Sequence, residues 1–201
     1  SQGNRRWFEL IVSRDDTVLT GVIEDITLQK QRELELEHQA SHDELTGALN
    51  RRGFEHLVMQ ELDQDCAQLI LYAVDIQRFS RLSVVYGSPL ANRVLKSCFE
   101  YLDQQLHPWG ELARFGVDQF VLFVSPDHPE FEQLAERLSE DTHPATDPLL
   151  EGLHNPQLTV DQYVLELQLH TCMLSLNRSL EVQEVFESIE EIFRRSSAMG
   201  A

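Results

Sequence analysis

The stretch ELARFGVDQFVLFV, residues 111–124, decides the fold more than any other part of the sequence. Two apolar runs, residues 111–115 and 120–124, flank the short sequence GVDQ. This pattern is typical of a β-hairpin with a tight polar turn. Because the turn carries Asp118, the sequence raises the question of whether it is an active site or the remains of one.

The segments on either side of the hairpin alternate between helix and strand patterns. Apolar residues at helical spacing predict helices, and apolar runs predict strands. The helices are expected over residues 50–63, 89–106, 129–139 and 181–195, the strands over 68–74 and 162–176, and a loop with Pro and His over 141–158. This order predicts an α/β domain that begins near Ser41 and has a sheet of mixed direction.

The first 40 residues have a different pattern. Residues 5–12 and 17–24 predict two short strands joined by a turn at Asp15-Asp16. From Asp25 the sequence is rich in Glu, Gln, Lys and Leu, and Asp25 or Thr27 is placed to cap a helix to about Ala40. Its apolar stripe is thin, which favours a linker helix over a core element.

Composition limits the class of protein. The 201 residues, 42% of them hydrophobic, are enough for one full domain and an appendage. The formal net charge of −18 argues against a nucleic-acid partner. No apolar run approaches the roughly 20 residues that span a bilayer, so we expect a cytoplasmic segment, with a membrane anchor in a longer parent left open. Cys66, Cys98 and Cys172 lack zinc-site spacing and are expected to be reduced thiols.

Three segments resemble motifs of one family. SHDELTGALNRRGF, residues 41–54, resembles the HDxLTGLxNRRxF opening of the GGDEF family, the diguanylate cyclase domains. Residues 74–95 resemble its DIDxFKxINDxxGHxxGDxxL segment, and ARFGVDQF, residues 113–120, corresponds to ARxGGDEF. The resemblance implies a GGDEF domain over residues 41–201. Residues 1–24 resemble the C-terminal strands of a PAS sensor domain, and residues 25–40 its signalling linker helix.

The resemblance also implies a reaction and a set of site positions. The family condenses two GTP molecules into cyclic di-GMP, with one GTP on each domain of an antiparallel pair and with Mg²⁺ as the metal. The metal positions match Asp75, the backbone carbonyl of Ile76, and Asp118, which also helps to activate the attacking 3′-hydroxyl. The substrate-binding positions match Phe79, Ser83, Asn92 and Gly116.

At the turn and at the base-binding positions this sequence departs from the family pattern. Gln119 is neutral where the motif has its acid, so one negative charge facing the metals is missing. Val117 replaces the second glycine, at a position expected to need positive φ or a close phosphate, so we expect strain or a reshaped turn. Ser83 and Asn92 replace an Asn and an Asp that read guanine, which predicts weak guanine selectivity.

Two further family motifs are altered. The family's closing helix carries YxAKxxGR, whereas residues 193–200 read FRRSSAMG, with Ser196 near the Lys position. Arg194 and Arg195 point in different directions on a helix, so we expect no replacement of that lysine. The product-inhibition motif RxxD should lie at residues 107–110, which read HPWG and offer neither the Arg fork nor the carboxylate.

Three other polar groups have simple structural interpretations. His42 and Asp43 are expected to cap a local turn. The set His154, His170 and Cys172 fits no metal-binding pattern. The acidic run Glu187, Glu190 and Glu191 is expected to be a solvated helix face.

The sequence therefore predicts a catalytically degenerate GGDEF domain, with Asp118 as a remnant of the catalytic site. Its expected role is regulatory or signal-transmitting, in a bacterial cyclic di-GMP protein that has other domains such as PAS and an EAL phosphodiesterase. Mg²⁺ binding is expected to be weak or absent and GTP binding weak. Two alternatives stay open: an active diguanylate cyclase, and a GTP-binding allosteric domain. A homodimer of the parent protein is also left open.

Overall fold

The computed structural model describes residues 5–14, 19–62, 68–139, 153, 156–177 and 179–199. They form two compact units, divided between Ala40 and Ser41, and each unit is described by itself. Several sequence predictions lie outside the described residues: the Asp15-Asp16 turn, Cys66, His154 and most of the loop 141–158.

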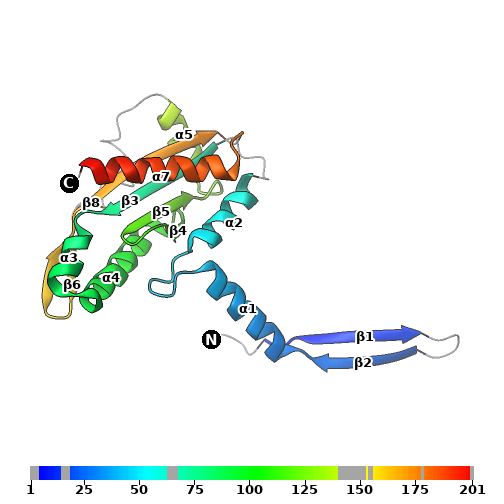
Figure 1. Cartoon of the computed structure of the whole chain (residues 1–201). Coiled ribbons are helices and arrows are strands. Elements are labelled where there is room, and N and C mark those ends of the chain that lie inside the picture. Colours follow the sequence, from blue (N-terminus) through cyan, green and yellow to red (C-terminus); the bar gives the residue numbers. More distant parts are fainter. Residues whose placement is uncertain are drawn as a thin grey trace. The chain divides into compact units, whose positions relative to one another are not determined.

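The first unit consists of a two-stranded hairpin and a helix (Figure 1). Strand β1 (Phe8–Arg14) pairs antiparallel with β2 (Leu19–Asp25). Helix α1 (Thr27–Ser41) begins where the Thr27 N–H donates to Asp25 Oδ1 at 3.0 Å, which confirms the predicted cap. Trp7 belongs to this unit, and its backbone N–H donates to Thr27 Oγ1 at 2.9 Å. None of the α1 side chains is buried.

The second unit is built on a four-stranded sheet in the order β4-β5-β3-β8. The strands are β3 (Gln68–Ile76), β4 (Gly110–Arg114), β5 (Gln119–Val124) and β8 (Leu169–Asn177). The expected mixed direction is wrong, because all three hydrogen-bonded pairs are antiparallel. The helical crossover after β3 does make β4 run parallel to β3, but β5 inserts between them. This is the order of a βαββαβ fold.

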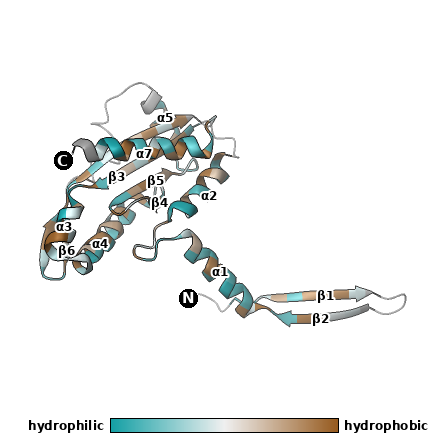
Figure 2. Cartoon of the chain, in the orientation of Figure 1, coloured by the Kyte–Doolittle hydropathy of each residue, from teal (hydrophilic) through white to brown (hydrophobic). Residues whose placement is uncertain are grey.

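Helices cover both faces of this sheet (Figure 1). Helices α2 (Arg51–Leu62) and α7 (Val182–Met199) pack on one face, and the apolar residues of α3 (Phe79–Tyr86), α4 (Ser88–Leu106) and α5 (Phe131–Ser139) pack on the other. Successive side chains of a strand point to opposite faces, so Leu71 packs toward α7 and Tyr72 toward α4. Hydrophobic and hydrophilic residues alternate along α7, as expected of a helix with one buried face (Figure 2).

Two element predictions need correction. The strand expected over 162–176 is two strands: β7 (Tyr163–Glu166), which pairs with β6 (Gln157–Val160), and β8. They separate because the Leu167 N–H donates to the Pro156 carbonyl and the Gln168 carbonyl accepts from the Gln77 N–H. Helix α3 was not predicted. It has eight residues, and Gly87, at φ 81°, ends it directly before α4. In the described parts of the chain, no helix has the length and apolar character needed to cross a bilayer.

Candidate functional site

Three polar side chains meet at one end of the sheet. Asp75 on β3 lies opposite Gln119 on β5 and opposite His170 on β8. Directly opposed residues of antiparallel strands point to the same face, which here is the face that α7 covers. Asp75 is only 7% exposed, so its carboxylate needs protein partners.

The partners of Asp75 come from α7 and from the turn after β3. Its Oδ2 accepts a hydrogen bond from Ser196 Oγ at 2.9 Å and one from Gln77 Nε2 at 3.3 Å. Ser196 Oγ also lies 2.9 Å from His170 Nδ1. Sequence reasoning did not predict the pairing of Ser196 or His170 with Asp75. A signal for Ser196 was present, because helical spacing from Ile189 and Phe193 places it on the buried face of α7.

Asp118 lies beside the same strand end. Its backbone carbonyl accepts from the Ile76 N–H at 3.0 Å, which extends the pairing of β3 and β5 by one bond. Burial, and then the charge of Asp75, raises the pKa of the Asp118 carboxyl above its usual range. The structure therefore brings together the three residues that the sequence comparison assigned to the metal, Asp75, Ile76 and Asp118.

At Asp75 Oδ2, a divalent ion would compete with hydrogen bonds that are already made. A magnesium ion needs near-octahedral oxygen ligands, and Asp75 Oδ2 already accepts two hydrogen bonds. Gln119, at the position of the motif's acid, contributes a neutral amide rather than a third carboxylate. Across the described ranges, no group of three or more His, Cys, Asp or Glu side chains is arranged to hold a metal ion.

The hairpin turn has ordinary backbone angles. Within the described residues, the non-glycine residues with positive φ are Arg78 and Asp161, so Val117 has no positive-φ strain, which was one of the two outcomes expected there besides a reshaped turn. Val117 instead projects outward and is 69% exposed. Gly116 lies close to the side chain of Gln119: a Cβ there would lie 2.6 Å from Oε1 of Gln119, the far end of a flexible side chain. The Gln119 side chain therefore packs against the turn that it follows.

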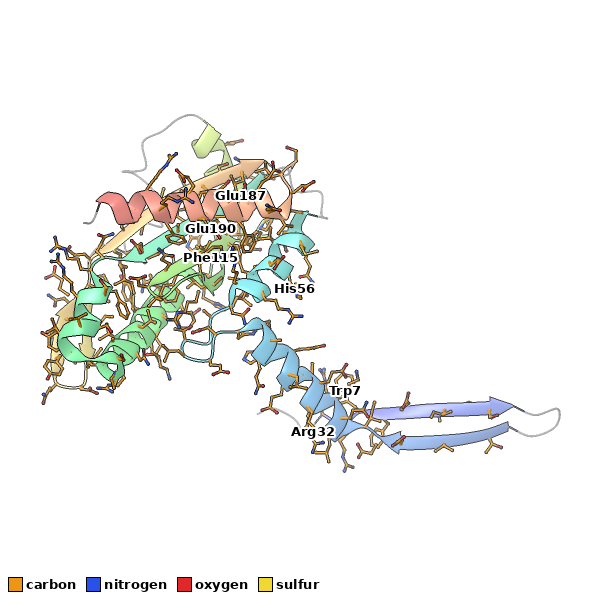
Figure 3. The ribbon with its side chains drawn as sticks, viewed as in Figure 1. Trp7, Arg32, His56, Phe115, Glu187 and Glu190 are labelled. Atoms are coloured by element: carbon orange, nitrogen blue, oxygen red, sulfur yellow. The ribbon has the colours of Figure 1, made fainter. Side chains whose placement is uncertain are left out.

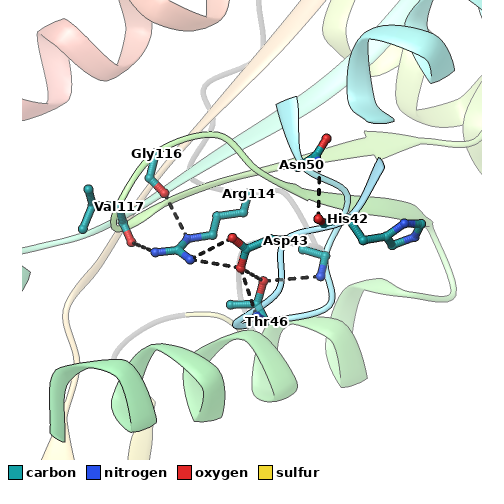
Figure 4. A network of polar contacts seen from close by, with 8 residues as sticks. His42, Asp43, Thr46, Asn50, Arg114, Gly116 and Val117 are labelled. Atoms are coloured by element: carbon teal, nitrogen blue, oxygen red, sulfur yellow. Dashed lines mark hydrogen bonds and ion pairs between the residues drawn. The ribbon is translucent and has the colours of Figure 1, made fainter. Parts of the chain in front are cut away.

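Arg114 ties this turn to the opening motif (Figure 4). Its guanidinium donates to the carbonyls of Gly116 at 3.1 Å and Val117 at 2.8 Å, and to both carboxylate oxygens of Asp43 at 3.0 and 3.1 Å. The backbone N–H and the hydroxyl of Thr46 also donate to Asp43. The structural interpretation of Asp43 is confirmed, because its carboxylate caps a local turn and fixes Arg114.

The expected substrate-binding positions do not share one pocket. Phe79 is buried, at 6% exposure, and lines a pocket of about 330 Å³ at the start of α3 together with Arg78. Ser83 is partly exposed on α3 and Asn92 is exposed on α4. Neither of them, nor Gly116, is among the residues that line this pocket.

The acidic residues of α7 are not a simple solvated face. Glu190 pairs with Arg51 at 2.5 Å, and the Arg51 guanidinium lies 5.0 Å from the ring centre of Phe115 and 5.1 Å from that of Phe186. Glu187, Glu190 and Phe115 are labelled in Figure 3. Glu191 pairs with both Arg194 and Arg195. These two arginines are exposed, and their contacts are with Glu191 rather than with Asp75.

The HPWG segment forms a corner between α4 and β4. Trp109 stacks on His128 with ring centres 4.0 Å apart, and His107 lies 3.7 Å from Asp103. Of the cysteines, Cys98 is fully buried, and burial raises its thiol pKa to about 12, while Cys172 is half-buried. Neither thiol takes part in the contacts around Asp75.

Comparison with known sequences gives a consistent family. The family model described as "Diguanylate cyclase, GGDEF domain" matches residues 40–195. Diguanylate cyclase DgcM of Escherichia coli K12 is 35% identical over 115 residues, which is 54% of this chain and 27% of that protein. Cyclic di-GMP phosphodiesterase PdeB of Shewanella oneidensis is 29% identical over 103 residues, 51% of this chain and 12% of that protein. The chain thus spans about a quarter or less of these relatives.

Solved structures agree on the fold. Diguanylate cyclase SiaD of Pseudomonas aeruginosa, in complex with its activator SiaC, has a TM-score of 0.64 at 15% identity, over 86% of this chain and 64% of that one. The FimX GGDEF domain of the same species has a TM-score of 0.61 at 19% identity, over 80% of this chain and 96% of that one. These likenesses confirm the predicted α/β fold.

Proposed function

The chain belongs to the GGDEF family of diguanylate cyclase domains, and from this premise we propose that it transmits signals without making cyclic di-GMP itself. The observation that carries the proposal is that the Asp75 carboxylate already has hydrogen-bond donors from the protein. The carboxylate at the family's first metal position is buried and accepts hydrogen bonds from Ser196 and Gln77. An ion that bound through Oδ2 would have to displace these donors.

The chemistry of the family explains why this matters. Attack of a ribose hydroxyl on an α-phosphate needs metal ions that neutralise phosphate charge, and carboxylates that hold them. Here Asp118 and Asp75 are the remaining acids, and Gln119 supplies no charge. We therefore assign Asp118 as a remnant of the catalytic site, with Val117 and Gln119 as the altered positions. Mg²⁺ binding is proposed to be weak or absent.

The proposed setting is a bacterial cyclic di-GMP signalling protein. A similar segment occurs in a cyclic di-GMP phosphodiesterase as well as in diguanylate cyclases, which supports a role beside other domains. We assign residues 1–24 to the end of a PAS domain, residues 25–40 to a linker helix, and the rest to the GGDEF domain. An EAL phosphodiesterase domain of the parent protein, in the cytoplasm, is the proposed target, and the parent is proposed to act as a homodimer.

The decisive experiment is a synthesis assay. Purified chain is incubated with GTP and Mg²⁺ or Mn²⁺, and products are separated by chromatography beside an active diguanylate cyclase. The matched control is Asp118→Ala, which removes the remaining carboxylate of the turn. We expect no more cyclic di-GMP from the natural chain than from this control. Turnover well above the control would replace the proposal with a working cyclase.

A GTP-binding domain without turnover is the second candidate. It is favoured by the pocket of about 330 Å³ at the start of α3, where Arg78 offers a cation beside the buried Phe79. Titration calorimetry with GTP tests it, with Arg78→Ala as the variant. Saturable binding that this substitution weakens supports the candidate, and no binding by the natural chain excludes it.

A further inference from the structure

We propose that His170, Ser196 and Asp75 form a clasp that holds the last turns of α7 to the sheet without any metal ion. The clasp deepens the proposed function, on which its significance for signalling rests. It assigns a new structural task to a carboxylate at a family metal position. It also predicts that the shape of this end of the domain is the same with and without divalent ions.

The donors and acceptors give the clasp a direction. An ionised carboxylate has no hydrogen to donate, so Ser196 must use its only hydroxyl hydrogen toward Asp75 Oδ2 at 2.9 Å. The same hydroxyl oxygen then accepts from His170 Nδ1, also at 2.9 Å. The hydrogen bonds therefore run from His170 on β8, through Ser196 on α7, to Asp75 on β3. One short chain of bonds joins three separate elements.

Burial makes the clasp important for stability. Asp75 and Ser196 are 7% and 3% exposed, so water replaces neither partner easily. In the described part of the chain, every buried side-chain nitrogen or oxygen has a hydrogen-bond partner. Removing the Ser196 hydroxyl leaves Asp75 Oδ2 with the longer contact from Gln77, at 3.3 Å. Hydrogen bonds to a charged group are among the stronger ones, so the loss should be measurable.

A metal-ligand role and the clasp predict opposite changes in stability when the charge of Asp75 is removed. If Asp75 were mainly a metal ligand, removing its charge without metal would relieve repulsion with Asp118 and stabilise the domain. In the clasp, Asp75 is the charged acceptor at the end of the chain of bonds. Removing its charge then weakens the hold on Ser196 and destabilises the domain.

The test is thermal unfolding of the whole chain in EDTA. We expect Ser196→Ala to lower the melting temperature of the second unit by about 3 to 8 °C, from the loss of a charged-group hydrogen bond. The matched control is Ser188→Ala on the same helix, whose hydroxyl donates to the Glu184 carbonyl, with an expected change below about 2 °C. Asp75→Asn should also lower the melting temperature, and the double variant should lose less than the sum of the two single losses.

Two further measurements complete the test. His170→Ala removes only the outer bond of the clasp and should give a smaller loss, which keeps the test informative if Ser196→Ala does not fold. Millimolar Mn²⁺ should leave the melting temperature of the natural chain unchanged. The clasp is overturned if Ser196→Ala and Ser188→Ala melt alike, or if Asp75→Asn raises the melting temperature in EDTA. Because the readout is stability, these results are independent of the synthesis assay, and either proposal can fail alone.

Discussion

The carboxylates of Asp43 and Asp118 lie in different surroundings, which shift their pKa values in opposite directions. Burial alone would raise the pKa of Asp43, but the hydrogen bonds from Thr46 and Arg114 outweigh it and lower that pKa. Asp118 has no such set of donors, so burial and the nearby Asp75 raise its pKa. The two residues therefore make opposite contributions to the pH dependence of stability.

Asp43→Asn should destabilise the domain at neutral pH by about 1 to 3 kcal/mol, because Arg114 loses its charged partner. Since the folded pKa of Asp43 is lowered, its contribution is present above the unfolded value of about 3.9 and is lost as pH falls through the folded pKa. Urea unfolding at several pH values measures this. Asp127→Asn, an exposed control, should change stability by less than about 0.5 kcal/mol. If Asp43→Asn lowered the free energy of unfolding by the same amount at every pH, the lowered pKa assigned to Asp43 would be contradicted.

Asp118→Asn should have the reverse effect. Because its folded pKa is raised, ionisation of Asp118 opposes folding, and this cost grows as pH rises from the unfolded value through the folded pKa. We expect the variant to be more stable than the natural chain at neutral pH, by up to about 1 kcal/mol since the group is partly exposed. The gain should vanish in acid below about pH 4. A loss of stability at neutral pH would show that Asp118 has a stabilising partner.

The sequence could predict which acids approach each other but not how they are satisfied. The resemblance of residues 74–95 and 113–120 to the family motifs assigned Asp75 and Asp118 to one metal, and the pairing of β3 with β5 places them at the same end of the sheet. Ser196 reaches Asp75 from 121 residues away, across the packing of a helix on a sheet. No local pattern carries such a contact, so the clasp could be found only in the folded structure.

Among the elements, the hairpin was predicted well and its turn less well. Alternating and apolar runs gave β4 and β5 nearly to the residue. At Val117 the sequence predicted strain or a reshaped turn; the structure shows ordinary angles, and Arg114 binds the carbonyls of Gly116 and Val117. The side chain of the last residue of β4 thus supports the turn that directly follows it.

Restoring the family residues tests this element. Val117→Gly alone should lower stability by about 0.5 to 1 kcal/mol, because it relieves no strain and frees the unfolded chain. Two double variants should each stay near background in the synthesis assay: Val117→Gly with Gln119→Glu, and Ser83→Asn with Asn92→Asp. The quadruple variant should gain measurable GTP binding by calorimetry, with at most faint synthesis. Robust synthesis by the variant with Val117→Gly and Gln119→Glu alone would show that Ser83 and Asn92 already bind guanine.

On the scale of the whole molecule, we expect weak self-association of this chain. Helix α1 has 15 residues and no buried side chain, which is short for an independent coiled coil of three or four heptads. A net charge of −18 also makes copies repel each other at low salt. Sedimentation at low and high salt measures this, with residues 41–201 alone as the matched control. A tight dimer that disappears when residues 1–40 are deleted would contradict the prediction.

The stacking of Trp109 on His128 has a practical consequence for optical spectroscopy. The chain has two tryptophans, and Trp7 and Trp109 lie in different units. Trp7→Phe therefore leaves a single indole fluorophore, placed at the HPWG corner and in contact with the imidazole ring of His128. Without an added dye, the emission of that variant follows the second unit alone, and the emission of Trp109→Phe follows the first.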